Sequence, residues 1–577
     1  MLPSHDSVIN LTESFGKYFV SKIDLIRSKI SATIVPATFD VIPASTCFNK
    51  IERFAQATED EVLKIIKSAK NSSCSSDPIP TTLLKECLDP LLPVITKLVN
   101  TSMASGEFPT LLKHALVKPL IKKSQLDPEI MKNYRPVSNL PFLAKVIEKV
   151  VASRLTTHMA NNNLHEKLQS AYKACHSTET ALLKVQNDIL MDMDKKRGVI
   201  LVLLDLSAAF DTIDHSILLQ QLSLRLGITG AALSWFSSYL SARTQSISID
   251  GVSSTPVLLQ YGVPQGSVLG PFLYTIYTLP LGDILRKAGV SYHLYADDTQ
   301  LYLSFDIRNQ DDLKEIMDKV QSCVCDIKSW MQCNKLKLNE EKTEILLISS
   351  SHFSSKVLVP EFKVDDTCIV PKSSVRNIGV VFDRHMSMKQ QINAICKSAH
   401  FHLRNIGGIR KYINRKACEQ LVHAFITSRL DYGNSLLFGL PDIHLKRLQR
   451  ILHIAARIIT LTPASEHITP ILKTLHWLPV HQRINYKILL LTFRALNSLA
   501  PSYLTELLVP HVPLRNLRSN SQNLLTIPKT SSRTFGDRAF AFAAPTLWNS
   551  LPCEMRLISN IHVFKSALKT FLFTNAY

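Results

Sequence analysis

Three aspartates are the residues of this 577-residue sequence whose type and surroundings point most directly to chemistry. Asp205 ends the apolar run GVILVLL, and Asp297 and Asp298 form an adjacent pair 92 residues later. A carboxylate at the end of a buried strand is costly unless it is solvated, paired or bound to a metal. If the segment that carries the pair lies beside this strand, three carboxylates converge. Divalent cations such as Mg²⁺, which prefer oxygen ligands, would then offset their repulsion.

Two ions in such a cluster would activate a 3′-hydroxyl and stabilise a leaving pyrophosphate, which is two-metal phosphoryl transfer. The alternative interpretation is structural. Asp205 would then cap a turn, and Asp297 and Asp298 would be ordinary turn residues of a hairpin. The aspartates alone do not decide between the two interpretations, but the segments between them favour the cluster.

Several elements are expected to position these residues. The continuous apolar run before Asp205 predicts a strand covered on both faces. The segment SYHLYADDTQLYLS predicts a β-hairpin with Ala296, Asp297 and Asp298 at its tip. Residues 377–383 (NIGVVFD) predict a further strand. Residues 311–331 predict an amphipathic helix, whose apolar stripe is Leu313, Ile316, Val320, Val324, Ile327 and Met331.

The flanking regions have weaker patterns. Residues 1–70 look mixed and weakly helical, except for helical apolar spacing in residues 60–70. A polar hinge follows at residues 71–80 (NSSCSSDPIP). Beyond residue 385 the chain is expected to be mainly helical to about residue 510, and then loop-rich with a short final helix.

The charge balance favours a polyanionic partner. Lys and Arg number 66 against 47 Asp and Glu, which gives a net charge of +19. Residues 113–149 hold eight Lys or Arg against three Asp or Glu, and residues 402–487 hold thirteen against four. Such a balance suits nucleic acid or an anionic membrane. No apolar run approaches the ~18–20 residues of a spanning helix, and no secretory signal begins the chain, so we expect an intracellular protein that contacts nucleic acid.

Ordered sequence blocks add a family resemblance. LDLSAAFDTIDH, which contains Asp205, and GVPQGSVLGP, which begins at Gly262, resemble blocks of reverse transcriptases, specifically those of LINE-type (non-long-terminal-repeat) retrotransposons. VKPLIKK, NYRPVSNLPFLAKVIEK and QSAYKACHSTETAL precede or adjoin them, and YADD, NEEKTE and IGVVFD follow in the same order. YADD alone is a weak signal. The ordered set, over roughly residues 105–385, is specific.

The resemblance implies a fold class and a domain plan. The fold class is α+β, as a right-hand polymerase with fingers, a palm built on an antiparallel sheet, and a helical thumb. Residues 1–75 would be a lead-in or linker, 76–385 the fingers and palm, 386–510 a basic thumb-like helical region, and 511–577 a mainly helical C-terminal extension.

The resemblance also implies the catalytic residues. Asp205, Asp297 and Asp298 would be the carboxylates that, with the backbone carbonyl of Leu206, hold two Mg²⁺ ions, with Mn²⁺ as an alternative. Lys342 matches a lysine that protonates pyrophosphate, although Lys335 and Lys337 lie nearby in the sequence.

Nucleotide-binding residues follow in the same way. Phe210 matches the aromatic side chain that excludes a 2′-hydroxyl and so selects deoxynucleotides; its alternative is a core position. Gln265 offers a donor and an acceptor, and Gly266 lets the backbone come close to template and nucleotide. Arg135 matches a fingers residue that contacts phosphates. Lys122 or Lys123 would assist it, and the alternative for all three is a solvated basic loop.

These residues favour an RNA-directed DNA polymerase that extends a DNA primer with dNTPs on an RNA template. A catalytically silent or domesticated nucleic-acid-binding relic of the same fold is the second hypothesis. An RNA-dependent RNA polymerase is disfavoured by Phe210. Only about 100 residues precede the fingers blocks, so we expect an amino-terminally truncated reading frame without the endonuclease that its relatives carry. Whether a separate endonuclease is a partner stays open. We expect a nuclear or cytoplasmic ribonucleoprotein that is neither secreted nor membrane-bound.

Overall fold

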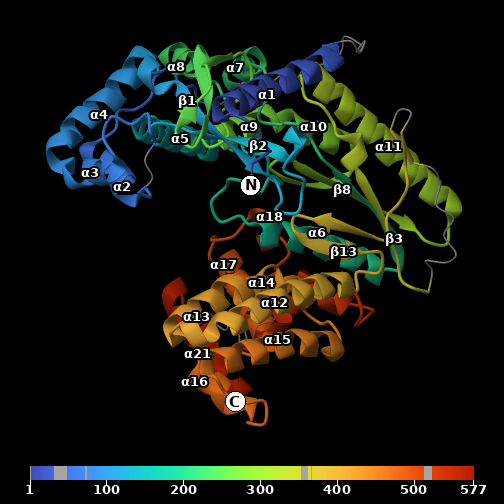
Figure 1. Ribbon diagram of the computed structural model, residues 1–577. Helices are drawn as coiled ribbons and strands as arrows, with labels where there is room; N and C mark the ends of the chain where they lie inside the picture. Colours follow the sequence, from blue (N-terminus) through green and yellow to red (C-terminus); the bar gives the residue numbers. More distant parts are fainter. Residues whose placement is uncertain (1, 32–48, 72–73, 353–361, 365–366, 513–522) are drawn as a thin grey trace. The chain divides into compact units, whose positions relative to one another are not determined.

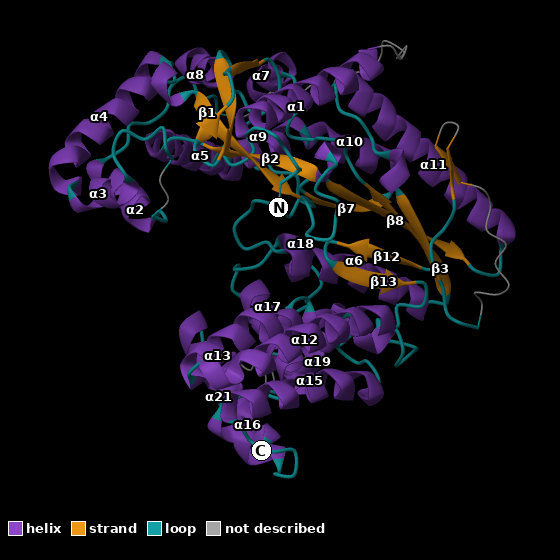
Figure 2. Ribbon diagram, in the orientation of Figure 1, coloured by secondary structure: helices purple, strands orange, loops and turns teal. Residues whose placement is uncertain are grey.

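The computed structural model describes residues 2–31, 49–71, 74–352, 362–364, 367–512 and 523–577, and it mixes helices with strands (Figures 1 and 2). Contacts between its parts divide the chain into two compact units. Unit 1 comprises Met1–Glu166, Asp205–Lys287 and Val324–Asn339, and unit 2 comprises Lys167–Leu204, Ala288–Cys323 and Glu340–Tyr577. Among the described residues, no helix combines the length and apolarity needed to cross a membrane.

Unit 1 is built on a five-stranded sheet of order β2-β1-β4-β5, with β6 also paired to β4. β1 runs antiparallel to β2 and parallel to β4. The strands are β1 (His114–Ile121), β2 (Tyr134–Asn139), β4 (Arg243–Ile249), β5 (Val252–Ser253) and β6 (Val257–Leu259). The helices are α1 (Val8–Ser31), α2 (Glu59–Ser68), α3 (Thr81–Glu86), α4 (Leu88–Ser105), α5 (Phe142–Asn161), α7 (His215–Leu224), α8 (Gly230–Leu240), α9 (Gly270–Tyr277) and α10 (Leu279–Ala288).

Helix α1 is an integral part of unit 1. Its apolar face puts Phe15 and Phe19 into a cluster of buried residues with Tyr134 of β2 and Ile247 of β4. The Phe15 ring meets the Tyr134 ring edge-on, with centroids 5.0 Å apart. The weakly helical lead-in expected for residues 1–70 is therefore, over Val8–Ser31, a 24-residue helix that packs on the sheet.

Unit 2 contains a four-stranded antiparallel sheet of order β7-β8-β3-β9. The strands are β3 (Arg197–Leu204), β7 (Ser291–Tyr295), β8 (Asp298–Asp306) and β9 (Glu344–Ile348). Helix α6 (Thr178–Asp194) packs against β3, and its start is fixed by a capping box between Ser177 and Thr180. The apolar run before Asp205 thus forms the predicted strand, and its consecutive buried residues from Gly198 to Val202 show that both faces are covered.

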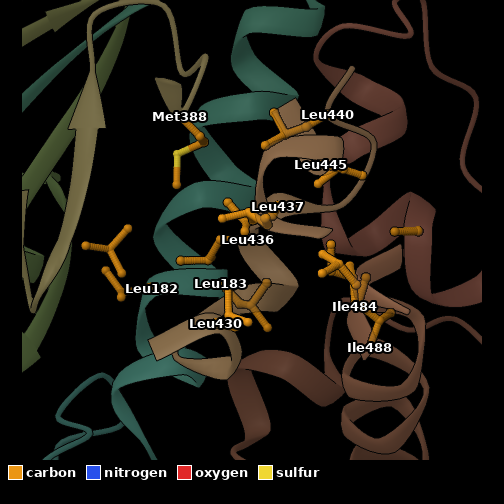
Figure 3. Packing of buried hydrophobic residues seen from close by; sticks show 14 of the residues in the cluster. Leu182, Leu183, Met388, Leu430, Leu436, Leu437, Leu440, Leu445, Ile484 and Ile488 are labelled. Carbon is orange, nitrogen blue, oxygen red and sulfur yellow. The ribbon is translucent and has the colours of Figure 1, made fainter. Parts of the chain in front are cut away.

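The rest of unit 2 is mainly helical, as expected. A large apolar cluster joins these helices to α6, and Figure 3 shows Leu182 and Leu183 with Leu436, Leu437 and Ile484 among its members. The helices are α12 (Lys389–Ile409), α13 (Arg415–Val422), α14 (Ser428–Asp431), α15 (Asp442–Thr460), α16 (Ile468–Thr474), α17 (Val480–Leu496), α18 (Ser502–Thr505), α19 (Phe540–Asn549), α20 (Cys553–Arg556) and α21 (Ile561–Ala576).

Most predicted elements are confirmed, but two predictions differ from the structure. The short final helix expected after residue 510 is instead the 16-residue α21, which follows α19 and α20. The hairpin forms as β7 and β8, and the amphipathic helix forms as α11 (Gln310–Cys333). The single strand predicted over residues 377–383 is instead a second hairpin, β12 (Ser374–Asn377) and β13 (Val380–Asp383). Ile378 and Gly379 both adopt positive φ and turn the chain between them. Two short strands, β10 (Phe362–Val364) and β11 (Thr367–Ile369), precede it. The domain boundaries at 75, 385 and 510 stay predictions.

Candidate active site

The register of β3 and β8 brings the segments that carry the three aspartates to one end of a strand pair. The last pair of this ladder is Leu204 with Thr299. Asp205 follows Leu204 directly in the chain, and Asp298 directly precedes Thr299. The chain passes from unit 2 to unit 1 at Asp205, whereas Asp297 and Asp298 belong to unit 2. The convergence of all three carboxylates therefore stays a prediction.

The aspartate pair lies on a tight turn. Tyr295 pairs with Asp298, so Ala296 and Asp297 form a two-residue loop, and Asp298 is the first residue of β8. Burial and the Asp297 carboxylate raise the pKa of the half-exposed Tyr172, because both disfavour a phenolate there. Tyr172 itself adopts a positive φ of 59°.

Asp205 is held by Asn339, which is not among the predicted site residues. The Asn339 amide N–H donates to the Asp205 carbonyl at 2.9 Å, and the Asn339 side-chain amide donates to the Asp205 carboxylate at 3.2 Å. Leu206 bridges to Leu338, and the Ser207 N–H donates to the Lys337 carbonyl at 2.9 Å. These bonds use the carbonyl of Asp205 and not that of Leu206.

Phe210 lies on a tyrosine ring. Its ring stacks on that of Tyr274 of α9, with centroids 4.8 Å apart and planes at 28°. Its carbonyl accepts the Val263 N–H at 3.0 Å, which ties the segment after Asp205 to the loop before Gly266. The Phe210 side chain is half-buried, in contrast to the fully buried Tyr274. Phe210 is therefore neither an enclosed core residue nor a free surface ring.

The two glycines of the loop are required by close approaches within the chain. Gly262 (φ +82°) lies where a Cβ would come 2.8 Å from the Asp211 carbonyl oxygen. Gly266 (φ +120°) lies where a Cβ would come 2.3 Å from the Ser138 carbonyl oxygen. The Ser138 N–H donates to the Gln265 carbonyl at 2.7 Å, so the loop is anchored on β2. The observed close approach of Gly266 is thus to β2; an approach to template or nucleotide stays a prediction.

The candidate phosphate contacts are exposed and lie near one another on the β1–β2 hairpin. Arg135 pairs in register with Leu120, and the Lys122 N–H donates to the Asn133 carbonyl at 2.8 Å. The Lys122 ammonium donates to the Lys132 carbonyl at 2.8 Å. Arg135, Lys122 and Lys123 all have exposed side chains. Lys342 ends a short 3₁₀ turn in unit 2 and is also exposed.

A cavity of about 310 Å³ in unit 1 is lined by two carboxylates, Asp24 and Asp211, that lie outside the predicted site residues. Asp211 lines it together with Gln265, Ser138 and Lys22 of α1. Burial raises the pKa of Asp211 to about 6, although the charges of Lys22 and Lys122 act in the opposite direction. Asp211 follows Phe210 directly, and nothing in the sequence pattern predicts the burial that causes this shift.

Within the described residues, no group of three or more His, Cys, Asp or Glu side chains lies close enough together to hold a metal ion. The donor types of the predicted set are nevertheless those that Mg²⁺ takes. Asp205, Asp297 and Asp298 supply carboxylate oxygens, and Leu206 has a carbonyl outside the bonds to residues 337–339.

Comparison with known proteins gives a family match for the middle of the chain. Residues 121–382 match the family described as reverse transcriptase (RNA-dependent DNA polymerase). The probable RNA-directed DNA polymerase from transposon X-element of Drosophila melanogaster is 25% identical over 336 residues, which are 57% of this chain and 36% of that protein.

Two further proteins of the same fly are similar. The probable RNA-directed DNA polymerase from transposon BS is 26% identical over 416 residues, which are 69% of this chain and 44% of that protein. The RNA-directed DNA polymerase from mobile element jockey is 28% identical over 284 residues, which are 48% of this chain and 30% of that protein. The chain thus spans less than half the length of these curated relatives.

Proposed function

Because this chain carries a reverse transcriptase domain related to those of non-long-terminal-repeat retrotransposons, we propose that it is an RNA-directed DNA polymerase. It extends a primer 3′-hydroxyl with deoxynucleotides on an RNA template. The observation that carries this proposal is the pairing of Leu204 with Thr299 inside the matched region. The residues next to this pair in the chain are Asp205 and Asp298, and this adjacency supports a shared role for the two carboxylates.

The acidic residues of the site act as metal ligands in this proposal. Asp205, Asp297 and Asp298, with the Leu206 carbonyl, would hold two Mg²⁺ ions, and Mn²⁺ is an alternative. When bound, the ions supply Lewis-acid stabilisation of phosphate oxygens and lower the pKa of the primer hydroxyl. The Asn339 amide, which donates to the Asp205 carboxylate, restricts the direction in which that carboxylate offers its oxygens.

The neighbouring residues bind the nucleotide. The Phe210 ring, which stacks on Tyr274, occupies the space that the 2′-hydroxyl of a ribonucleotide would need. Gln265 and Gly266 border the nucleotide from the loop that is anchored on β2. Arg135, with Lys122 or Lys123, contacts its phosphates, and Lys342 gives a proton to the leaving pyrophosphate.

Larger surfaces hold the nucleic acid. We assign a right-hand arrangement in which the antiparallel sheet of unit 2 is the palm, the region around β1 and β2 belongs to the fingers, and the helices after residue 385 form the thumb. The excess of basic residues in 113–149 and in 402–487 neutralises template and primer phosphates without reading sequence.

Primer extension with purified protein on a homopolymer RNA template tests the proposal. Asp297→Asn should lower incorporation by about a hundredfold or more, because one metal ligand loses its charge. Asp318→Asn is the matched control, since this exposed residue of α11 undergoes the same chemical change away from the turn. Equal activity of the two variants would refute the site assignment.

Two further outcomes separate the alternatives. Phe210→Val should admit ribonucleotides, and unchanged sugar discrimination would contradict the assigned role of the ring. Salt-dependent RNA binding without incorporation under any divalent metal would identify the chain instead as a nucleic-acid-binding relic of this fold.

A further inference from the structure

A glutamine outside the aspartate motifs lies against the turn that carries Asp297. Gln169 is buried, with 4% of its surface exposed. Its segment forms an isolated parallel bridge to Leu294 of β7. The Ser170 N–H donates to the Leu294 carbonyl at 2.9 Å, and the Leu294 N–H donates to the Leu168 carbonyl at 2.9 Å. β7 is the edge strand of its sheet, so residues 168–170 occupy the hydrogen-bonding groups along part of this edge.

The Gln169 side chain engages both polar groups of one turn residue. Its Oε1 accepts the Ala296 N–H at 3.0 Å, and its Nε2 donates to the Ala296 carbonyl at 3.3 Å. The same Oε1 also accepts the Ala171 N–H at 2.9 Å, which fixes the direction of the amide. The carboxamide therefore acts on Ala296 as a neighbouring strand would, at the point where the strand pairing ends.

This contact matters because the turn does not favour its own conformation. Ala296 is the first residue of the two-residue loop and has a φ of 56°. Two-residue hairpin loops need a positive φ at this position, and glycine, asparagine or aspartate usually supply it. For an alanine the left-handed region costs about 1–2 kcal/mol. The two hydrogen bonds from Gln169 offset this conformational cost, which no glycine, asparagine or aspartate at residue 296 reduces.

A second buried chain of hydrogen bonds holds the platform on which Gln169 stands. The Ser170 hydroxyl lies 2.8 Å from His293 Nε2 of β7 and 2.8 Å from the Tyr503 hydroxyl of α18. The Tyr503 hydroxyl in turn donates to the Thr180 hydroxyl at 3.0 Å, at the start of α6. Residues 168–170 are thus fixed relative to the sheet by bonds that do not involve the Gln169 side chain.

We propose that Gln169 is a positioning residue for catalysis: by binding the Ala296 peptide it sets the direction in which the adjoining Asp297 offers its carboxylate. This inference rests on the proposed function, in which Asp297 is a metal ligand. Gln169 touches neither the metal nor the substrate in this role. Its effect passes through the Ala296 backbone to the next residue, where a small displacement of a reacting group lowers the rate strongly.

The first experiment needs no metal and no activity. Residue-resolved hydrogen exchange of the wild-type protein should show the Ala296 amide protected, because its N–H is bonded to a buried side chain. In Gln169→Met, which keeps the length of the side chain but has neither amide group, exchange of Ala296 should be at least about tenfold faster. An Ala296 amide that exchanges at its unprotected rate in the wild-type protein overturns the proposal, whatever the variant does.

Gln186→Met is the matched control. Gln186 is also buried in unit 2, with 3% exposed, and its amide donates to the Leu436 carbonyl at 3.0 Å. Its replacement removes a comparable buried hydrogen bond without touching the turn. Hydrogen exchange of the Ala296 amide should therefore stay at the wild-type rate in Gln186→Met. If both variants accelerate this exchange equally, Gln169 only contributes to overall stability and the proposal is refuted.

The second experiment measures catalysis at a series of Mg²⁺ concentrations. Gln169→Met should lower kcat about tenfold to a hundredfold and raise the Mg²⁺ concentration for half-maximal activity, with unchanged KM for the template-primer. Gln186→Met should leave the Mg²⁺ dependence unchanged. Ala296→Gly, which removes the cost of positive φ, should weaken the effect of Gln169→Met when the two are combined.

The two proposals fail in different ways. If the wild-type protein incorporates no nucleotide, the proposed function fails while the hydrogen-exchange experiment still tests the contact. If the wild-type protein is active and Gln169→Met shares the Mg²⁺ dependence of Gln186→Met, the positioning role is refuted and the proposed function stands.

Discussion

Acidification is predicted to destabilise unit 2 through one buried imidazole. His293 of β7 is fully buried, its Nε2 faces the Ser170 hydroxyl at 2.8 Å, and its Nδ1 has no hydrogen-bond partner among the described residues. Burial, together with the positive charges of Lys184, His176 and Lys173, lowers the pKa of His293 from 6.5 to about 3. A proton added to this ring would place an unpaired charged N–H in the core.

The sign of the effect follows from the direction of the pKa shift. Since the folded pKa lies below the unfolded value of 6.5, the unfolded chain binds a proton that the folded chain excludes. The stability associated with neutral His293 is fully present above pH 6.5 and is lost as the pH falls toward 3. At about 1.4 kcal/mol per pH unit, acidification from about pH 6.5 to 4.5 removes about 2 kcal/mol, with a limit of about 5 kcal/mol.

The assay is urea denaturation at pH 7.5, 6.5, 5.5 and 4.5, compared between the wild-type protein and His293→Leu. Other titrating groups are common to both proteins, so the difference between their unfolding free energies isolates the imidazole. Leucine removes the titrating imidazole and also its hydrogen bond to Ser170. Loss of that bond changes the unfolding free energy of the variant by the same amount at every pH. We expect the wild-type curve to fall toward that of the variant by about 2 kcal/mol between pH 6.5 and 4.5. Parallel curves would refute the assignment of a depressed pKa to His293.

Three further perturbations test the geometry of unit 1. Gly266→Ala should lower the unfolding free energy by about 3 kcal/mol, because it combines a disfavoured φ with a collision against the Ser138 carbonyl; an unchanged melting temperature would contradict this close approach. Asp211→Asn should stabilise the protein at pH 8 by up to about 3 kcal/mol and have no effect at pH 4. The reason is that the folded pKa of about 6 lies above the ordinary 3.8, so ionising the buried acid lowers the stability of the folded state. Thermal melts at both pH values check this, and a stability difference that does not depend on pH would count against it. Arg27→Met should lower the unfolding free energy by about 2 kcal/mol, since the guanidinium pairs with Asp214 at 2.7 Å and lies 3.7 Å from the centre of the Tyr261 ring. Limited proteolysis within α1 should become faster, and an unchanged cleavage rate would show that this ion pair does not hold the helix.

Local patterns were sufficient for the elements that carry the aspartates. The run before Asp205 could be predicted as a strand because Arg197–Leu204 includes an unbroken apolar stretch, which is typical of a strand covered on both faces. The hairpin could be predicted because alternating residues flank a short acidic turn. The resemblance to reverse transcriptases, which rested on ordered blocks, is confirmed by the family match over residues 121–382.

The same patterns failed where the deciding contacts are distant in sequence. Helix α1 is stabilised by packing of Phe15 and Phe19 on strands more than a hundred residues away, which no window of residues 1–70 contains. The second hairpin, around Gly379, was predicted as one strand because an apolar run does not reveal a positive φ at two adjacent residues. Asn339 begins the NEEKTE block, but nothing local marks its side chain as the partner of Asp205.

These failures have a common physical origin in the loops of the candidate site. A strand or helix satisfies its own backbone polar groups by a periodic rule, so its sequence predicts it. A tight turn satisfies few of them, so water or groups from other segments supply the remaining bonds. Ala296 obtains them from Gln169, 127 residues away, just as the Gln265 carbonyl obtains its donor from Ser138. The residues that give the turns of this site their shape are therefore distant in sequence, and they have to be identified from hydrogen bonds in three dimensions.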